Sequence, residues 1–291
     1  MKIPKECVMI TLFAKAKINL CLDVVGRLPN GYHEVRMIMQ TVGISDKLTF
    51  EKTEGEIRIT TNKGELPLGE DNLIYKAAAL MKETYGISGG VSVALEKHIP
   101  IAAGMAGGST DAAATLKAMN ELYELGLSEE ELRKLGVKLG ADVPYCVMGG
   151  TALSEGIGEI LTKLPPMPKC VLLVAKPDIN VSTKYVYETL DSKEIPVHPK
   201  VDEMIGKIED GDVSGVVALL GNVLENVTVE RYKVVDEIKQ VMLRAGAQGS
   251  LMSGSGPSVF GIYESTEKAA AAAEEIRHLG LANEVFVTQP E

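Results

Sequence analysis

The sequence predicts an α+β protein built from two domains, and three observations support this prediction. The length of 291 residues fits about two domains. Apolar and polar residues alternate over residues 11–25, which indicates a half-buried strand near the N-terminus. The C-terminal part reads as strand, helices, glycine loop, strand, helix and strand, an order that fits a ferredoxin-like α+β half. A shift to proline-rich composition near Leu164 places the boundary between predicted domains 1–164 and 165–291.

Composition and charge exclude several classes of protein. The chain is 45% hydrophobic, has no tryptophan and contains four phenylalanines, so its core is expected to be mostly aliphatic. A formal net charge of −10 argues against nonspecific binding of nucleic acid. No apolar run approaches the roughly 18–20 residues of a membrane span, and residues 1–7 lack the form of a secretory signal. The cysteines carry no C-x-x-C pair, which favours reduced thiols in the cytoplasm: Cys7, Cys21, Cys146 and Cys170.

The first predicted strand carries polar residues on one face. Its alternation places four of them together: Lys15, Lys17, Asn19 and Asp23. An ordinary solvent-facing surface accounts for Lys15 and Asp23 without any function. A Pro-Asn-Gly turn follows the strand. After it, Tyr32 and His33 have the local character of a packed aromatic ring and a surface histidine.

Two more strands are predicted over residues 47–61 and 91–97. Between them, Asp71 or Asn72 is expected to cap a helix that runs to about residue 85. The second strand leads into the glycine- and alanine-rich stretch 100–110, which is the central motif of the sequence.

This glycine loop precedes a helix predicted over residues 111–125. Ser109 and Thr110 have the character of N-cap residues, and Asp111 would place a negative charge in the first turn. Small residues before a helix start leave backbone N–H groups open to an anion, most often phosphate. The alternative is a turn that only lets the helix pack closely. Neither the Walker pattern nor the dinucleotide fingerprint is present.

The remaining elements follow from local signals. Ser128 and Glu131 form a capping-box pattern that opens a helix closed by Gly140. Asp142 then precedes Pro144 in the manner of a helix N-cap. The later part is expected to contain a buried strand at 170–175, helices at 200–220, 230–245 and 266–278, a second glycine loop at 250–257, and strands at 258–263 and 284–288.

Four separated motifs in this order resemble those of the GHMP kinases. They are Ala-Lys-x-Asn-Leu at 16–20, Gly-Tyr-His at 31–33, the loop at 100–110 with Gly-Ala-Asp-Val-Pro at 140–144, and Ser-Gly-Ser-Gly-Pro at 253–257. The resemblance covers about residues 13–260. The loop departs from the family pattern where alanines replace glycines, at Ala102, Ala103 and Ala106. Alanine keeps its N–H group but resists a positive φ. The implied fold has an N-terminal βαβ-containing domain and a C-terminal ferredoxin-like domain.

The resemblance implies transfer of the γ-phosphoryl group of ATP to a hydroxyl of a small molecule, with Mg²⁺ bridging the phosphates. Gly-Tyr-His and Gly-Ala-Asp-Val-Pro are similar to one branch of the family. The substrate of that branch carries a cytidine diphosphate and serves non-mevalonate isoprenoid precursor synthesis. The implied partners are therefore ATP and a cytidine diphosphate substrate, without nucleic acid or membrane, in a monomer or weak homodimer.

The resemblance also implies roles for individual residues. Asp142 would accept the proton of the hydroxyl, and Lys17 would keep Asp142 ionised and stabilise developing charge. Ser109 would be the metal ligand. ATP would be bound by Asn72, Lys97, Pro100, Ile101, Ala102, Ala103, Gly104, Met105, Ala106, Gly107, Gly108, Ser109 and Thr110. The substrate would be bound by Asn19, Tyr32, His33, Thr183, Gly254, Ser255 and Gly256.

Two other functions remain open from the sequence. One is a GHMP kinase that acts on a different small alcohol, and competition by CMP or CDP separates it from the cytidine-specific branch. The other is a nucleotide-binding sensor without turnover, which an ADP-release assay tests.

Overall fold

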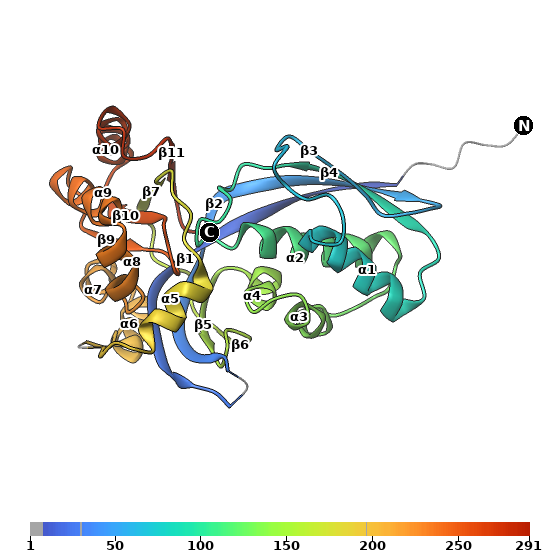
Figure 1. The fold of residues 1–291 in the computed structure, drawn as a ribbon, viewed down its shortest axis with the longest axis horizontal. Helices are drawn as coiled ribbons and strands as arrows, with labels where there is room; N and C mark the ends of the chain where they lie inside the picture. Colours follow the sequence, from blue (N-terminus) through green and yellow to red (C-terminus); the bar gives the residue numbers. More distant parts are fainter. Residues whose placement is uncertain (1–7, 30, 196) are drawn as a thin grey trace, which may run out of the picture. The chain divides into compact units, whose positions relative to one another are not determined.

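The computed structural model describes residues 8–29, 31–195 and 197–291 of the chain (Figure 1). Cys7 and Asn30, named above, lie outside these described residues. The chain divides into two compact units, and neither is continuous in sequence. Unit 1 comprises Met1–Lys15, Ser45–Ile99 and Ala106–Met148, and unit 2 comprises Ala16–Ile44, Pro100–Met105 and Gly149–Glu291. The predicted boundary between residues 164 and 165 falls in a stretch without helix or strand and stays a prediction.

The sheet of unit 1 uses one end of each of two long strands, β1 (Met9–Arg27) and β2 (His33–Thr53). Strand β4 (Gly90–Glu96) pairs antiparallel with β2, so that Lys47 lies opposite Glu96. Strand β3 (Arg58–Thr61) pairs parallel with β4. The single strand predicted over residues 47–61 was therefore wrong. The chain leaves the sheet at Thr53 and returns at Arg58.

Four helices of unit 1 bury an aliphatic core against these strands: α1 (Leu73–Tyr85), α2 (Gly107–Leu122), α3 (Glu129–Val137) and α4 (Val143–Met148) (Figure 1). Helix α2 packs against both α1 and α4. Leu116 and Met119, at helical spacing on α2, are fully buried, as are Leu48 and Phe50 on β2. Alanines on the facing sides of α1 and α2 let the two helices approach closely.

Local capping signals are confirmed in unit 1. Helix α1 is capped by Asn72, whose Oδ1 accepts a hydrogen bond from the Ile74 N–H at 2.8 Å. Helix α3 has the predicted capping box, in which Ser128 and Glu131 bond each other's backbone N–H groups. Both helices begin at the residue after the cap. The local capping residues were therefore sufficient to predict where α1 and α3 begin.

Unit 2 uses the other ends of β1 and β2. Strand β5 (Thr151–Glu155) pairs antiparallel with β2, β6 (Ile160–Lys163) pairs with β5, and the short β8 (Gly221–Asn222) lies parallel to β1. The unit's smaller helices are α5 (Thr183–Leu190), α6 (Val201–Glu209), α7 (Val213–Ala218) and α8 (Glu225–Arg231).

A four-stranded antiparallel sheet with the order β11-β7-β10-β9 forms the C-terminal half of unit 2. Its strands are β7 (Val171–Lys176), β9 (Gly249–Met252), β10 (Val259–Tyr263) and β11 (Glu284–Thr288). Helices α9 (Lys233–Arg244) and α10 (Thr266–His278) pack against it (Figure 1). This arrangement confirms the predicted ferredoxin-like half, and the bounds of α10 and β11 match those predicted.

The polar face of β1 is only partly exposed to solvent. Lys15 is exposed, as predicted, but Asp23 is 9% exposed. The predicted solvent-facing role of Asp23 was wrong because its carboxylate pairs with Nδ1 of His198 at 2.7 Å. No local signal links two residues that are 175 positions apart in the chain.

Three described cysteines are free thiols: Cys21, Cys146 and Cys170. Burial raises the pKa of the Cys21 thiol to about 12 and that of Cys170 to about 11. Both therefore stay protonated and unreactive at neutral pH. Among the described residues, no helix is long and apolar enough to cross a membrane.

Candidate active site

Helix α2 begins earlier than the sequence predicted, and a different residue caps it. The helix starts at Gly107, and its N-cap is Ala106, which has the left-handed φ of 57° and provides no side-chain hydrogen bond. The predicted start at Asp111 and the predicted caps Ser109 and Thr110 were therefore wrong. Ser109 and Thr110 lie inside the first turn, and Asp111 lies beyond it.

The loop before α2 has strained backbone where alanine replaces glycine. Ala102 and Ala106 have φ of 52° and 57°, beside φ of 72° at Gly104. A left-handed conformation costs alanine on the order of 1 kcal/mol, and such strain clusters at functional loops. Helix geometry leaves the N–H groups of Gly107, Gly108 and Ser109 without partners inside the helix. The start of α2 is thus suited to an anion.

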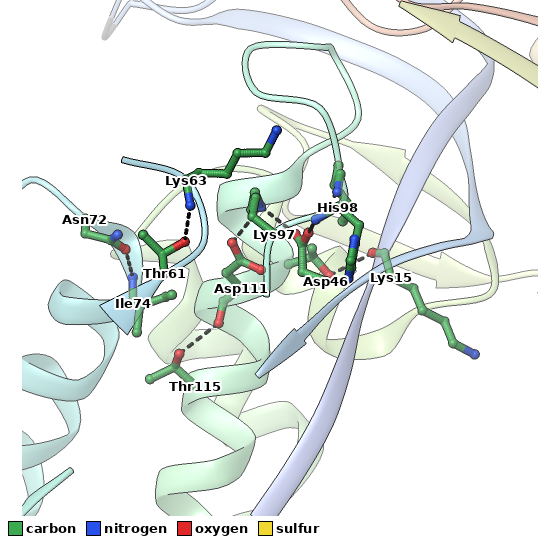
Figure 2. Close-up of polar contacts among 12 residues, drawn as sticks. Lys15, Asp46, Thr61, Lys63, Asn72, Ile74, Lys97, His98, Asp111 and Thr115 are labelled. Carbon is green, nitrogen blue, oxygen red and sulfur yellow. Dashed lines mark hydrogen bonds and ion pairs between the residues drawn. The ribbon is translucent and has the colours of Figure 1, made fainter. Parts of the chain in front are cut away.

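Below this helix start lies a buried ion cluster of Asp46, Lys97 and Asp111, which we call the lysine triad (Figure 2). The Lys97 ammonium bonds Oδ2 of Asp46 and, at 2.7 Å, Oδ2 of Asp111. The exposed fractions of the three side chains are 0–5%. The triad joins Asp46 within β2 and Lys97 just after β4 to the beginning of α2.

The two carboxylates of the triad differ in how well they are satisfied. Oδ1 of Asp46 accepts the backbone N–H groups of His98 and Ile99 at 2.6 and 2.8 Å. Oδ1 of Asp111 is buried without a hydrogen-bond partner among the described residues. Burial raises the pKa of Asp111 to about 8, although the nearby Lys97 ammonium lowers it. One ammonium thus pairs with two buried carboxyl groups, and the uncompensated negative charge would fall on Asp111, whose pKa is raised.

The triad lies directly against the candidate phosphate site. A Cβ atom added to Gly107 would lie 3.0 Å from Nζ of Lys97, and one added to Gly108 would lie 3.3 Å from Leu73 at the start of α1. Lys97 and the start of α1, which Asn72 caps, thus lie close to the start of α2 (Figure 2). Their polar groups have structural partners: Lys97 holds the two carboxylates, and Asn72 caps α1.

Two further predicted residues belong to unit 1. The hydroxyl of Thr110 donates to the backbone oxygen of Lys15 at 2.8 Å, which fixes the first turn of α2 to β1. Asp142 is half-buried and immediately precedes α4, and its backbone oxygen accepts the N–H of Cys146 at 3.0 Å. Because α4 packs against α2, Asp142 lies next to a helix that contacts α2.

In unit 2, Lys17 and Asn19 lie side by side on β1 and are almost fully buried. Nζ of Lys17 donates to Oδ1 of Asn19 at 2.7 Å, and the Lys17 N–H bonds the backbone oxygen of Met105 at 3.2 Å. Nδ2 of Asn19 reaches Sδ of Met37 at 3.2 Å. The Lys17 backbone is thus bonded to the first glycine loop, and its ammonium is held by Asn19.

The second glycine loop was predicted over residues 250–257, but residues 250–252 belong to β9, so the loop itself spans residues 253–258. It touches the first loop within unit 2. The hydroxyl of Ser253 donates to the backbone oxygen of Gly104 at 3.0 Å. A Cβ on Gly104 would collide with the Ser253 backbone oxygen, and one on Gly254 would lie 3.2 Å from the Gly104 oxygen. Only glycine therefore permits this approach. The loop joins the antiparallel strands β9 and β10.

Ser255 and Thr183 complete the cluster around the second loop. Their hydroxyl oxygens are 2.8 Å apart, and Thr228 donates to the Ser255 backbone oxygen at 3.1 Å. Gly256 has φ of 86°. Unit 2 thus brings together six predicted residues: Lys17, Asn19, Gly104, Thr183, Gly254 and Ser255.

His33 and Tyr32 differ from the local expectation. Tyr32 is 59% exposed rather than packed in the interior. His33 instead bonds Asp191 through Nε2 at 2.6 Å, and its ring lies 4.9 Å from that of Tyr187. Asp191 and Tyr187 were missed by sequence reasoning, as were Asp46 and Ser253, because their partners are far away in the chain.

Metal-ligating side chains are sparse. No group of three or more His, Cys, Asp or Glu residues that could hold a metal occurs within residues 8–29, 31–195 and 197–291. This donor set fits a Mg²⁺ ion that is bound mainly through phosphates, as is common for Mg²⁺ in kinases. Ser109, half-buried in the first turn of α2, is the predicted ligand.

Comparison with known proteins agrees with this geometry. The family model described as "GHMP kinases N terminal domain" matches residues 72–150, and the model "GHMP kinases C terminal" matches residues 199–280. A protein of Lachnospira eligens named 4-diphosphocytidyl-2-C-methyl-D-erythritol kinase is 54% identical over 96% of this chain and 98% of its own. A protein of the same name from Lachnoclostridium phytofermentans is 51% identical over 97% of each chain.

Comparison with solved structures identifies the same family. A crystal structure of 4-(cytidine 5'-diphospho)-2C-methyl-D-erythritol kinase matches with a TM-score of 0.83 at 32% identity, covering 97% of this chain and 99% of its own. Homoserine kinase from Cytophaga hutchinsonii matches with a TM-score of 0.78 at 22% identity, covering 99% and 96%, which shows a shared fold. The chain belongs to the GHMP kinase family.

Proposed function

We propose that this chain transfers the γ-phosphoryl group of ATP to the 2-hydroxyl of 4-diphosphocytidyl-2-C-methyl-D-erythritol, a step of non-mevalonate isoprenoid precursor synthesis. The observation that carries the proposal is identity of about half, across nearly the whole chain, to relatives named for this activity. Both glycine loops and both proposed catalytic residues lie inside the matched length.

For the chemical step, we propose that Asp142 is the general base and Lys17 its electrostatic partner. Phosphoryl transfer requires in-line positioning and stabilisation of charge more than covalent chemistry. A carboxylate accepts the hydroxyl proton, and an ammonium near it favours its ionised form. The hydrogen bond of Lys17 to Asn19 and its burial support a fixed ammonium.

For ATP, we propose that the loop at 100–110 binds the phosphates. The left-handed backbone at Ala102, Gly104 and Ala106 and the open N–H groups at the start of α2 support this role. Asn72 and Lys97 are proposed to lie near the nucleotide. Lys97 would then act mainly by fixing the loop, since its ammonium is already bound by two carboxylates.

We propose that the reaction requires Mg²⁺ in addition to ATP. When bound, it neutralises charge on the phosphates during transfer. Ser109 is the side chain proposed to contact it, and the phosphates of ATP would provide the other ligands. A sharp loss of activity when EDTA removes the metal, restored by added Mg²⁺, is the expected result.

At the substrate end, we propose that His33 and Tyr32 contact the cytosine. An exposed aromatic ring next to a hydrogen-bonding imidazole suits a nucleobase. Asn19, Thr183 and the residues of the second glycine loop, Gly254, Ser255 and Gly256, are proposed to contact the remainder of the substrate. Their gathering within unit 2 supports this assignment.

A coupled ADP-release assay tests the proposal directly. Turnover is expected with 4-diphosphocytidyl-2-C-methyl-D-erythritol, inhibited by CDP, and absent with homoserine or mevalonate. Turnover with homoserine or mevalonate alone would instead assign the chain to another reaction of its family. ATP binding without turnover of any of the three would indicate a sensor.

The Asp142→Asn variant tests the proposed base. It keeps the shape and removes the proton acceptor, so turnover should drop by roughly 10²–10⁴-fold while ATP affinity changes little. Asparagine caps a helix about as well as aspartate, so a residue that only caps would leave rate and thermal midpoint nearly unchanged. A folded variant within a few fold of parental turnover would exclude the catalytic role.

A cytoplasmic location and a monomeric or weakly dimeric state belong to the same proposal. Sedimentation of the purified chain over a range of concentrations measures its oligomeric state.

A further inference from the structure

A small cluster in unit 2 joins β2 to the end of α5. Nε2 of His33 lies 2.6 Å from Oδ1 of Asp191, and the His33 ring lies 4.9 Å from the Tyr187 ring at an angle of 37°. Nη1 of Arg27 lies 3.4 Å from the other oxygen of Asp191. The His33 side chain is 11% exposed, so its ring is held on several sides yet open on one.

The Asp191 carboxylate determines which nitrogen of His33 carries the proton. An ionised carboxylate is an acceptor only, so the hydrogen of this bond belongs to Nε2. In the neutral ring, the other nitrogen, Nδ1, is then an acceptor. Within the described part of the chain, the His33 side chain forms no other hydrogen bond. Nδ1 therefore remains available to a ligand as an acceptor.

We propose that Asp191 is a positioning residue that fixes this tautomer of His33 and thereby makes the site select cytosine over uracil. The inference rests on the proposed function, in which His33 faces the cytosine. Cytosine presents an amino donor at carbon 4, where uracil presents a carbonyl acceptor. An acceptor Nδ1 of His33 can accept a hydrogen bond from the amino group of cytosine, whereas it repels the carbonyl oxygen of uracil, which is also an acceptor. Without Asp191, the ring can exchange tautomers and pair with either base.

A purely structural role of Asp191 predicts something different. Ion pairs of partly exposed side chains contribute little to stability, so such a role would leave base preference unchanged. The chain offers a matched control in Asp202, a carboxylate of the same unit that binds Arg36 at 2.6 and 2.8 Å. Arg36 and Asp202 are not assigned to the site, so Asp202→Ala removes an ion pair without touching His33.

The test compares kcat/KM for 4-diphosphocytidyl-2-C-methyl-D-erythritol and for its uridine analogue. In Asp191→Ala, the ratio of the two values should fall by about 10- to 100-fold, with the KM for ATP and the thermal midpoint close to parental. Asp191→Asn keeps an acceptor oxygen, so its ratio should stay closer to the parental value than that of Asp191→Ala. Asp202→Ala should keep the parental ratio. Adding Asp191→Ala to His33→Ala should lower the ratio no further, because Asp191 acts through the ring.

The outcomes separate this inference from the proposed function. If the parent turns over the cytidine substrate but a folded Asp191→Ala variant keeps the parental ratio, the inference is wrong and the function stands. An equal fall in Asp202→Ala would also overturn it. A parent that turns over neither substrate contradicts the proposed function, and the inference fails with it.

Discussion

Two charged clusters in this protein use similar groups in opposite surroundings. The lysine triad of unit 1 has side chains that are 0–5% exposed, whereas His33 and Asp191 of unit 2 are 11% and 32% exposed. The three side chains of the triad are almost fully buried and bonded to one another, and Oδ1 of Asp111 has no hydrogen-bond partner among the described residues. The His33 pair leaves one ring nitrogen open. Burial therefore gives the first cluster a structural role beside the start of α2, whereas the second cluster keeps the exposure that its proposed role in recognition requires.

The energetic consequences of the two clusters differ as well. A buried charge that loses its partner is strongly destabilising, because the remaining charge keeps its desolvation cost. A partly exposed pair is screened by water and can be lost with little effect on folding. Changes in the triad should thus appear in stability first, and changes in the His33 pair should appear in ligand preference first.

The largest effect is expected for Lys97→Met. It leaves two buried carboxylates without a cation, so the free energy of unfolding should fall by about 3–5 kcal/mol. The control is Lys47→Met, which removes the exposed partner of Glu96 in the same sheet and should cost less than about 1 kcal/mol. Urea unfolding of the two variants makes the comparison. Equal losses would contradict the structural importance of the triad.

Gly107→Val tests the contact between the triad and the phosphate loop. Its Cβ would lie 3.0 Å from Nζ of Lys97, and overpacking of this kind costs roughly 1–3 kcal/mol. ATP affinity should fall about tenfold or more, because the side chain also crowds the helix start. Gly64→Val, at a glycine with open space around its Cβ position, is the control. Parental ATP affinity in a folded Gly107→Val variant would place the phosphates elsewhere.

A smaller effect is expected for Asp111→Asn, and it depends on pH. Burial raises the pKa of Asp111 to about 8, so the folded protein holds a proton that the unfolded chain releases at lower pH. The resulting stabilisation is present in acid and is lost as the pH rises through about 8. Asparagine does not titrate, so the variant should lose this decline in stability.

Thermal midpoints of parent and Asp111→Asn, measured from about pH 5 to about pH 9, provide the measurement. The parent's midpoint should fall relative to that of the variant as the pH rises. Parallel curves would mean that Asp111 is ionised throughout this range, with Lys97 compensating both carboxylates.

Most of the fold could be predicted from the sequence because its signals are local. The caps at Asn72 and Ser128, and the helix 266–278 followed by the strand 284–288, depend on neighbours a few residues away. The start of α2 could not be predicted, because Ala106 adopts a left-handed φ that alanine normally avoids. The strand break after Thr53 likewise had no sufficiently strong turn signal.

The candidate site was predictable only in part. Lys17, Asn19 and the two glycine loops were found through motifs, and Lys17, Asn19, Gly104 and Ser253 lie close together within unit 2. The triad was not found, because Asp46 and Lys97 are 51 positions apart and each resembles a surface charge in its local sequence. Asp191 is 158 positions from His33. Pairings over such distances depend on the fold, which local patterns do not specify.

The most direct test of this contrast is the affinity of His33→Ala for CDP, measured by titration calorimetry alongside its affinity for ATP. A lost hydrogen bond and ring contact should weaken CDP binding by about 1–3 kcal/mol, while ATP affinity and the thermal midpoint stay near parental. This result would place base recognition at His33. Parental CDP affinity in the variant, or a loss of stability without a change in CDP affinity, would contradict the account.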